Sequence, residues 1–214
     1  TQAVRAELSA GGFDDPVWVE QWDVAFAGLY LDALQANLGG GQVPGPWAAA
    51  FAAARALPPL QHILLGMNAH INYDLPQALL AVIGDADFDD QPLMARRAAD
   101  HRHIDHVLAG LVDRRENLPD AESRRPGLRD RFLAPANRLA TKRFLTEARA
   151  KVWINARVLA NARRKGPDAY AEQLAELERL SAARVADLTR PGNVLLRLAA
   201  RGFGVVIVES QDVQ

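Results

Sequence analysis

The chain has no cysteine among its 214 residues, which excludes disulfides, thiolate metal ligands and cysteine nucleophiles. It also lacks a large net charge, because the formal value is only -1, so its charge gives no sign of binding to nucleic acid or to an anionic membrane. No apolar run is long enough to span a bilayer. With 49% hydrophobic residues, a chain of this length can bury one large core. We therefore expect a single all-α domain over residues 1–214, located in the cytoplasm.

Lysine, arginine and glutamate are absent from residues 56 to 95, where every charged residue is an aspartate. A surface helix keeps one charged face, so a helix without one is buried on most sides. This composition predicts a buried central helix from Leu57 to Ile83. Pro76 either kinks this helix or lies in the first turn of a second one, and in the second case Asp74 could serve only as its cap.

Elsewhere, apolar residues recur at helical spacing between short connections. The pattern predicts an all-α bundle of about six to eight helices around the central one. We expect further helices over residues 14–37, 47–56, 93–114, 128–133, 135–164, 168–189 and 194–201. Residues 203–208 could form a strand, but without a partner strand we expect an extended tail packed on the bundle.

The central helix carries polar side chains, which a buried helix tolerates only where they have partners. At 100° per residue these side chains form two stripes. The first stripe comprises His62, Gly66, His70, Tyr73 and Asp74, and the second comprises Asn68 and Asn72. His70 and Asp74 are four residues apart and can reach a common point. We therefore predict a polar pocket along the first stripe.

Two other helices place a charged residue on an apolar face. Asp100 lies within the buried face predicted for residues 93–114, with His101 and His103 at its edges. A buried carboxylate needs a partner or a cation, so we expect Asp100 to meet the first stripe across an enclosed space. Arg149 lies within the inner face of residues 135–164 and either pairs with a buried aspartate or holds an anionic group.

The string LGMNAHINYDLP at residues 65–76, preceded by Trp47 and followed by Asp100 and Arg149, resembles a family known as a domain of unknown function in bacteria and some fungi. The resemblance covers most of the chain. It implies a shared helical fold and a shared site, and it brings no activity with it. The abundance of Ala, Leu and Arg with little Lys separately favours a bacterial origin.

Three hypotheses follow for the polar cluster. In the first, a divalent zinc, iron or manganese ion is held by residues from two helices. Its ligands would be His62, His70, Asp74, Asp100 and His103. The Glu-x-x-His, His-Asp and His-Glu-x-x-His signatures of known metal enzymes are absent from the sequence.

In the second hypothesis the protein is a metal-free enzyme acting on a small apolar or amphipathic molecule. His70 with Asp74 would be the general base, Tyr73 would donate a proton, and Arg149 would hold a carboxylate or phosphate, with Asp100 nearby. In the third, the cluster is a hydrogen-bond network in a protein that binds an apolar ligand without catalysis. We favour a small-molecule enzyme of unassigned class, with or without a metal. The sequence leaves the oligomeric state open.

Overall fold

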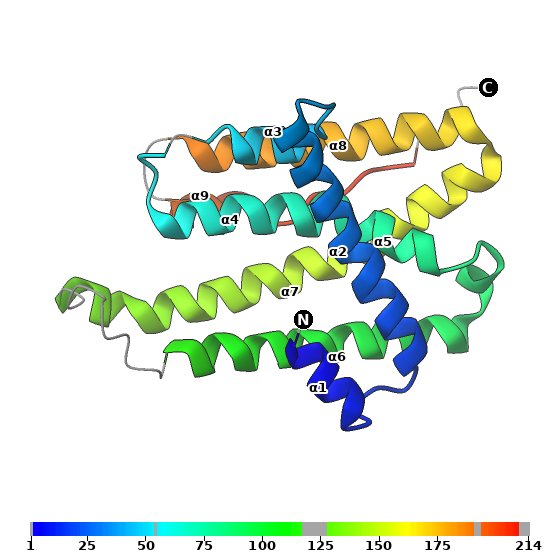
Figure 1. The fold of residues 1–214 in the computed structure, drawn as a ribbon, viewed down its shortest axis with the longest axis horizontal. Helices are drawn as coiled ribbons and strands as arrows, with labels where there is room; N and C mark the ends of the chain where they lie inside the picture. Colours follow the sequence, from blue (N-terminus) through cyan, green and yellow to red (C-terminus); the bar gives the residue numbers. More distant parts are fainter. Residues whose placement is uncertain (1, 54, 117–127, 191–193, 210–214) are drawn as a thin grey trace.

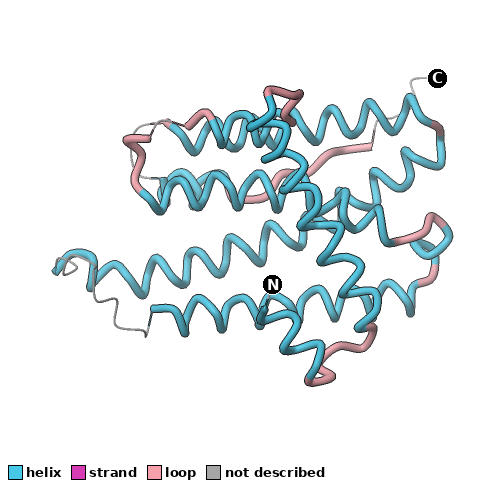
Figure 2. The backbone as a smooth tube through the Cα atoms, viewed as in Figure 1, coloured by secondary structure: helices cyan, strands magenta, loops and turns pink. Residues whose placement is uncertain are grey.

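A computed structural model describes residues 2–53, 55–116, 128–190 and 194–209, and its regular structure is helical (Figures 1 and 2). The elements are α1 (Gln2–Ser9), α2 (Pro16–Gly39), α3 (Gly45–Phe51), α4 (Pro59–Ala69), the π-helix η1 (His70–Asp74), α5 (Leu75–Val82), the 3₁₀ turn η2 (Ala86–Asp89), α6 (Gln91–Glu116), α7 (Leu128–Lys165), α8 (Pro167–Thr189) and α9 (Val194–Arg201). These ranges contain no β-strand, and the predicted all-α bundle is confirmed. Within the same ranges, none of the helices combines the length and apolar character needed to cross a bilayer.

Helix α2 begins and ends within two residues of the predicted range 14–37. The Asp15 side chain accepts a hydrogen bond from the Trp18 N–H at 3.0 Å, and Pro16 lies in the first turn. Gly40 closes the helix with a φ of 70°, a conformation that favours glycine. In Figure 1, α2 runs diagonally across the other helices, and it packs against η1, α3, α5 and α6.

The central segment is buried as predicted, but it is divided into α4, η1 and α5. The Leu75 N–H bonds to the His70 carbonyl five residues earlier, which marks the wider turn of a π-helix. Pro76 accounts for this turn, because it has no N–H and its ring would clash with the carbonyl of Asn72 in a continuous α-helix. The proline therefore neither ends the segment nor sharply breaks it. It widens one turn in the middle of the core.

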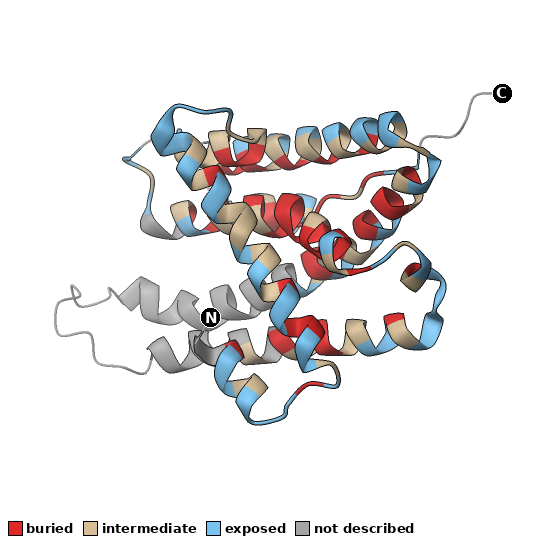
Figure 3. Ribbon diagram, turned by 45° about the vertical axis from the view of Figure 1, so that its right-hand side comes forward, coloured by how far each residue is buried: buried red, intermediate tan, exposed pale blue. Residues whose placement is uncertain are grey.

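The core surrounds this divided segment. Helix α4 packs on α3 and α8, while α5 packs on α2 and α7. The fully buried side chains of the segment include Leu65, Leu75, Leu79 and Ile83. Figure 3 shows buried residues along the inward faces of the helices and exposed residues on their outer faces. At about 25 cal/mol per Å² of apolar surface, the burial of these side chains stabilises the fold.

Two elements differ from the sequence predictions by more than two residues. The helix expected over residues 47–56 already ends at Phe51 in α3, followed by a turn. Residues 128–133 and 135–164 were expected to form two segments, and they belong to the single helix α7. Tertiary packing of a long helix can outweigh local helix-breaking signals.

The C-terminal segment, residues 203–208, is extended without pairing to a strand, as predicted. Alternate side chains point inward, so Phe203, Val205 and Ile207 are buried whereas Val208 is exposed. The backbone of this segment bonds to side chains of α4, η1 and α7 instead of to a neighbouring strand. The Asn72 amide bonds both to the Phe203 carbonyl and to the Val205 N–H, at 3.0 and 3.1 Å. The second polar stripe, Asn68 and Asn72, thus holds the C-terminal residues 203–208 in place.

Candidate functional site

The first polar stripe places an imidazole and a carboxylate in direct contact at η1. His70 Nδ1 lies 2.8 Å from Asp74 Oδ2. The same carboxylate oxygen accepts a hydrogen bond of 2.8 Å from Trp47 Nε1 of α3. Asp74 is 2% exposed, while the His70 side chain is 26% exposed. The buried carboxylate therefore holds one nitrogen of an imidazole that reaches solvent.

Burial decides the acidity of Asp74. Removal from water disfavours the carboxylate and raises the pKa of Asp74 above its ordinary value, while the hydrogen bond and charge of His70 and the bond from Trp47 act in the opposite direction. No capping bond from the Asp74 side chain to α5 is formed. The alternative interpretation of Asp74 as a simple helix cap is therefore not what the geometry shows.

Aromatic rings fix the orientation of the His70 imidazole. Phe26 of α2 stacks on it, with ring centroids 3.6 Å apart and planes 7° apart. Tyr30 and Trp47 contact the same ring at tilted angles, with centroids at 6.0 and 5.8 Å. Since Nδ1 is bound to Asp74, Nε2 is the nitrogen left for other chemistry. Within the described residues, it has no hydrogen-bond partner.

A cleft of about 540 Å³ lies beside this imidazole. Its walls come from α2, α3, α4 and η1, and they are mainly apolar. The lining residues are Tyr30, Trp47, Ala50, Phe51, His62, Gly66, Met67 and His70. His62 lies two helical turns before His70, about 12 Å along the helix axis. The cleft thus offers an aromatic surface bordered by two imidazoles.

Tyr73 does not line this cleft. Its neighbours include Glu178 and Tyr170 of α8, and burial, followed by the charges of Glu178 and Asp74, raises its pKa. The helical wheel misplaced Tyr73 because it assumed 100° per residue across a turn that is π-helical. A phenol with a raised pKa on the α8 side is a core residue rather than a proton donor to the cleft.

Asp100 serves the start of α2 instead of the cleft. Its two carboxylate oxygens accept hydrogen bonds of 2.8 Å from the backbone N–H groups of Asp14 and Asp15. An anion is favourable beside the N-terminus of a helix. Asp100 therefore has partners, as a buried carboxylate requires, but they are backbone N–H groups. The structure does not bring Asp100 to His70, so the expected meeting of Asp100 with the first stripe is wrong.

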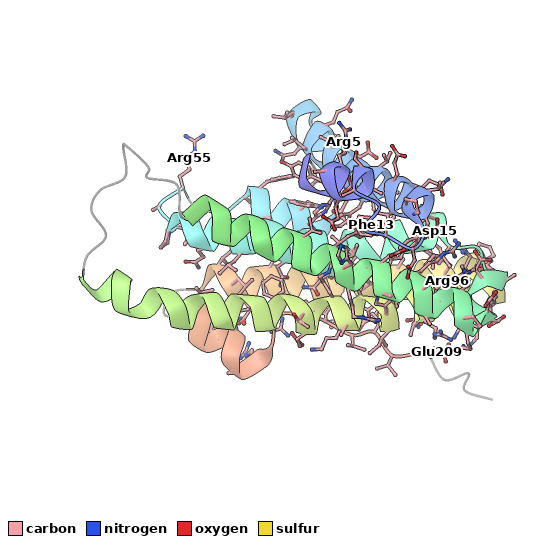
Figure 4. All side chains as sticks on the ribbon, turned by 90° about the horizontal axis from the view of Figure 1, so that it is seen from below. Arg5, Phe13, Asp15, Arg55, Arg96 and Glu209 are labelled. Atoms are coloured by element: carbon pink, nitrogen blue, oxygen red, sulfur yellow. The ribbon has the colours of Figure 1, made fainter. Side chains whose placement is uncertain are left out.

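His103 also lies apart from the cleft. Its Nε2 pairs with Glu7 Oε1 of α1 at 2.8 Å, and both side chains are more than a third exposed. The Phe13 ring meets the His103 ring edge to face at 5.1 Å. Figure 4 shows Phe13 and Asp15, from the connection between α1 and α2, beside α6. His103 thus helps to attach the N-terminal region to α6.

Arg149 and His101 form a second buried polar contact. Arg149 Nη2 lies 3.1 Å from His101 Nε2 and donates to the His101 carbonyl at 3.2 Å. The guanidinium also lies over the Trp22 ring, 5.8 Å from its centroid. Burial, followed by the positive charges of Arg149 and Arg102, places the pKa of His101 well below its ordinary value. His101 is therefore neutral, and Arg149 is not among the residues lining the cleft.

The structure does not bring the five predicted metal ligands together. His70 and Asp74 are in contact, His62 lines the cleft two helical turns earlier, and Asp100 and His103 have the separate partners given above. Among the described residues, no group of three histidine, aspartate or glutamate side chains is placed to hold a metal ion.

The aromatic components of the site, Phe26, Tyr30 and Phe51, were not among the site residues predicted from the sequence. Their spacing was a usable signal, because Trp22, Phe26 and Tyr30 recur every four residues, as do Trp47 and Phe51. Such pairs lie on one helix face and can build an aromatic wall.

The fold and the site define an all-α protein with an imidazole–carboxylate pair at the edge of an aromatic cleft. The chain belongs to a family of unknown function, DUF5995, whose model matches residues 1–191. No curated protein and no solved structure is detectably similar to it.

The capping role of Asp100 predicts a loss of stability without loss of the cleft. Asp100→Ala leaves the backbone N–H groups of Asp14 and Asp15 without their acceptor, which should cost about 1–3 kcal/mol in total, because Asp14 is exposed and its N–H can bond to water instead. Urea denaturation measures this change, and Asp100→Asn, which keeps one acceptor oxygen, should lie between the variant and the parent. Unchanged stability in Asp100→Ala would contradict the capping role.

The buried neutral state of His101 predicts a pH dependence of stability. Because its folded pKa lies below the unfolded value, the unfolded chain binds a proton first as the pH falls below about 6.5. Stability is thus lost toward acid, by up to about 1.4 kcal/mol per pH unit. Denaturation between pH 6.5 and 5 should show a shallower decline in His101→Gln than in the parent chain. Equal slopes in the two proteins would refute this assignment.

Proposed function

We propose that this protein is a small-molecule enzyme in which His70 acts as a general base on an apolar or amphipathic substrate bound in the cleft. Asp74 and Trp47 are positioning residues for that imidazole. The proposed mechanism needs no metal ion. The cytoplasmic location expected from the sequence stays a prediction.

One observation carries this proposal: Asp74 is bound to Nδ1 of an imidazole whose Nε2 has no partner among the described residues and which borders the cleft. A carboxylate at one nitrogen holds the ring in one tautomer and stabilises the positive charge that forms when the other nitrogen takes a proton. Trp47 fixes the carboxylate, and Phe26 fixes the plane of the ring. This arrangement suits proton transfer.

The cleft lining favours proton abstraction over covalent catalysis. The described residues that line it include no serine, threonine, cysteine or lysine, which are the usual nucleophiles. Tyr30, Trp47 and Phe51 offer ring faces to a planar apolar group. A substrate would place its acidic C–H or a bound water near His70 Nε2, with its apolar part against these rings.

A non-catalytic binding protein is the second candidate. The apolar majority of the lining favours it, because such walls can hold a ligand without any proton transfer. The two candidates share a bound ligand and differ in turnover, so a probe with an acidic proton separates them.

The probe 5-nitrobenzisoxazole suits this purpose. A base removes its C3 proton, the N–O bond breaks, and the coloured 2-cyano-4-nitrophenolate leaves without any co-reactant. We expect saturable turnover by the parent chain. His70→Gln should lower the rate by about a hundredfold or more, because general-base catalysis contributes about 10² to 10⁴. Asp74→Asn should also lose most of the rate, since an amide N–H facing Nδ1 favours the wrong tautomer.

Gly66→Leu is the matched control for the cleft. An added Cβ at Gly66 meets only Trp47, at 4.0 Å, so the helix accepts the change while the longer side chain fills the cleft. This variant should keep its thermal stability and lose binding of the probe. Bound probe without turnover in the parent chain would support the binding protein instead. Turnover that disappears with chelator, together with metal found by elemental analysis, would overturn the metal-free mechanism.

A further inference from the structure

The C-terminal segment is bound in its groove mainly through its backbone. From the α4–η1 side, Asn68 and Asn72 both donate to the Phe203 carbonyl at 3.0 Å. From α7, the Asn155 amide donates to the Val205 carbonyl and accepts from the Ile207 N–H, each at 3.0 Å. Three helical elements, α4, η1 and α7, thus offer asparagine amides in the places where a neighbouring strand would offer peptide groups.

The start of the segment is held in the same way by an acidic side chain of α7. Glu147 Oε2 accepts from the N–H groups of Phe203 and Gly204, at 3.0 and 3.2 Å. Lys151 pairs with Glu147 and donates to the Gly204 carbonyl at 3.2 Å. Every backbone N–H and carbonyl named in these contacts is satisfied by a side chain rather than by the backbone of another element.

The groove also selects among side chains. Phe203 and Ile207 are 1% exposed and Val205 is 6% exposed, so each occupies a buried position. At Gly204 a Cβ atom would lie 2.8 Å from Ala148 Cα, a backbone atom of α7 that cannot move aside. The groove therefore accepts the pattern Phe-Gly-Val-x-Ile and rejects any residue with a Cβ atom at its second position.

Backbone hydrogen bonds combined with sites for alternate side chains are the means by which proteins bind extended peptides. We propose that the groove between η1 and α7 is a peptide-binding site for the sequence Phe-Gly-Val-x-Ile. In this structure residues 203–207 of the same chain fill the groove. When these residues are displaced, a separate peptide with the same sequence can bind in their place.

This binding site has a direct connection to the cleft. Asn72, which bonds to the segment at two backbone positions, lies in η1 between His70 and Asp74. Docking of the segment thereby stabilises the π-helical turn that presents the imidazole–carboxylate pair. This second part of the inference rests on the proposed function, because it predicts that an empty groove lowers turnover.

The full chain with Gly204→Val tests the binding site. The probe is a fluorescein-labelled peptide of residues 202–209, and binding is read by fluorescence anisotropy. We expect Gly204→Val to bind the peptide, and the parent chain, whose groove is filled, to bind it at least about tenfold more weakly. A peptide with valine in place of its own Gly204 should not bind. Gly28→Val is the matched control, because an added Cβ there meets nothing within 4 Å and the segment stays in place.

The groove contacts are tested in the same background. Adding Asn155→Ala to Gly204→Val should weaken peptide binding by about tenfold, since two hydrogen bonds to the peptide are lost. Failure of the peptide to bind a Gly204→Val chain with parental helical content would overturn the proposal. Equal binding by the parent and Gly204→Val chains would overturn it as well.

Hydrogen exchange covers the case in which Gly204→Val does not fold. In the full chain, Asn155→Ala removes the acceptor of the Ile207 N–H, so this amide should exchange about tenfold faster than in the parent. An unchanged exchange rate at Ile207 would show that the segment is not held in the groove and would overturn the proposal.

Turnover of 5-nitrobenzisoxazole tests the connection to the cleft. It should fall in Gly204→Val and return when unlabelled peptide is added. If the peptide binds and turnover does not respond, the connection is wrong, although the loss in His70→Gln still supports the proposed function. If the parent chain shows no turnover while the peptide binds to Gly204→Val, the proposed function fails and the peptide site stands.

Discussion

The wide turn at η1 is the constraint on which the rest of the structure depends. Pro76 cannot donate a hydrogen bond and cannot follow an ordinary α-helical turn, so the buried segment accommodates it by a π-helical turn over His70–Asp74. Within this one turn, His70 and Asp74 pair beside the cleft while Asn72 bonds to the C-terminal segment. A single irregular turn therefore serves two neighbouring surfaces of the protein.

Burial of Asp74 gives this turn its chemical character. A carboxylate removed from water is costly unless hydrogen-bond donors satisfy it. Asp74 has two such donors, one from a distant helix and one from a single turn earlier in the chain. Trp47 supplies a fixed donor from α3, and His70 supplies the second, from the turn itself. The aromatic stack on Phe26 then limits the rotation of the imidazole. Helices α2, α3 and η1 each contribute one part of a single unit, which is typical of sites on rigid scaffolds.

Local patterns in the sequence predicted the parts of this arrangement that depend on neighbours within one helix. The lack of Lys, Arg and Glu identified the buried segment, and the four-residue spacing identified the His70–Asp74 pair. Contacts between distant segments could not be predicted in this way. The hydrogen bond from Trp47 to Asp74 joins two distant segments, and so do the bonds from two backbone N–H groups to Asp100. Such contacts produce no periodic pattern in the sequence. Tyr73 was misplaced because the wheel cannot anticipate a π-helical turn.

The most direct test is the tautomer of His70 in the ligand-free protein, read from ¹⁵N chemical shifts of the imidazole at neutral pH, with His70→Gln to assign the signals. We expect a hydrogen-bonded proton on Nδ1, shared with Asp74, and an unprotonated Nε2 facing the cleft. A proton on Nε2 with Nδ1 unprotonated, or a ring that exchanges freely between the two forms, would contradict it.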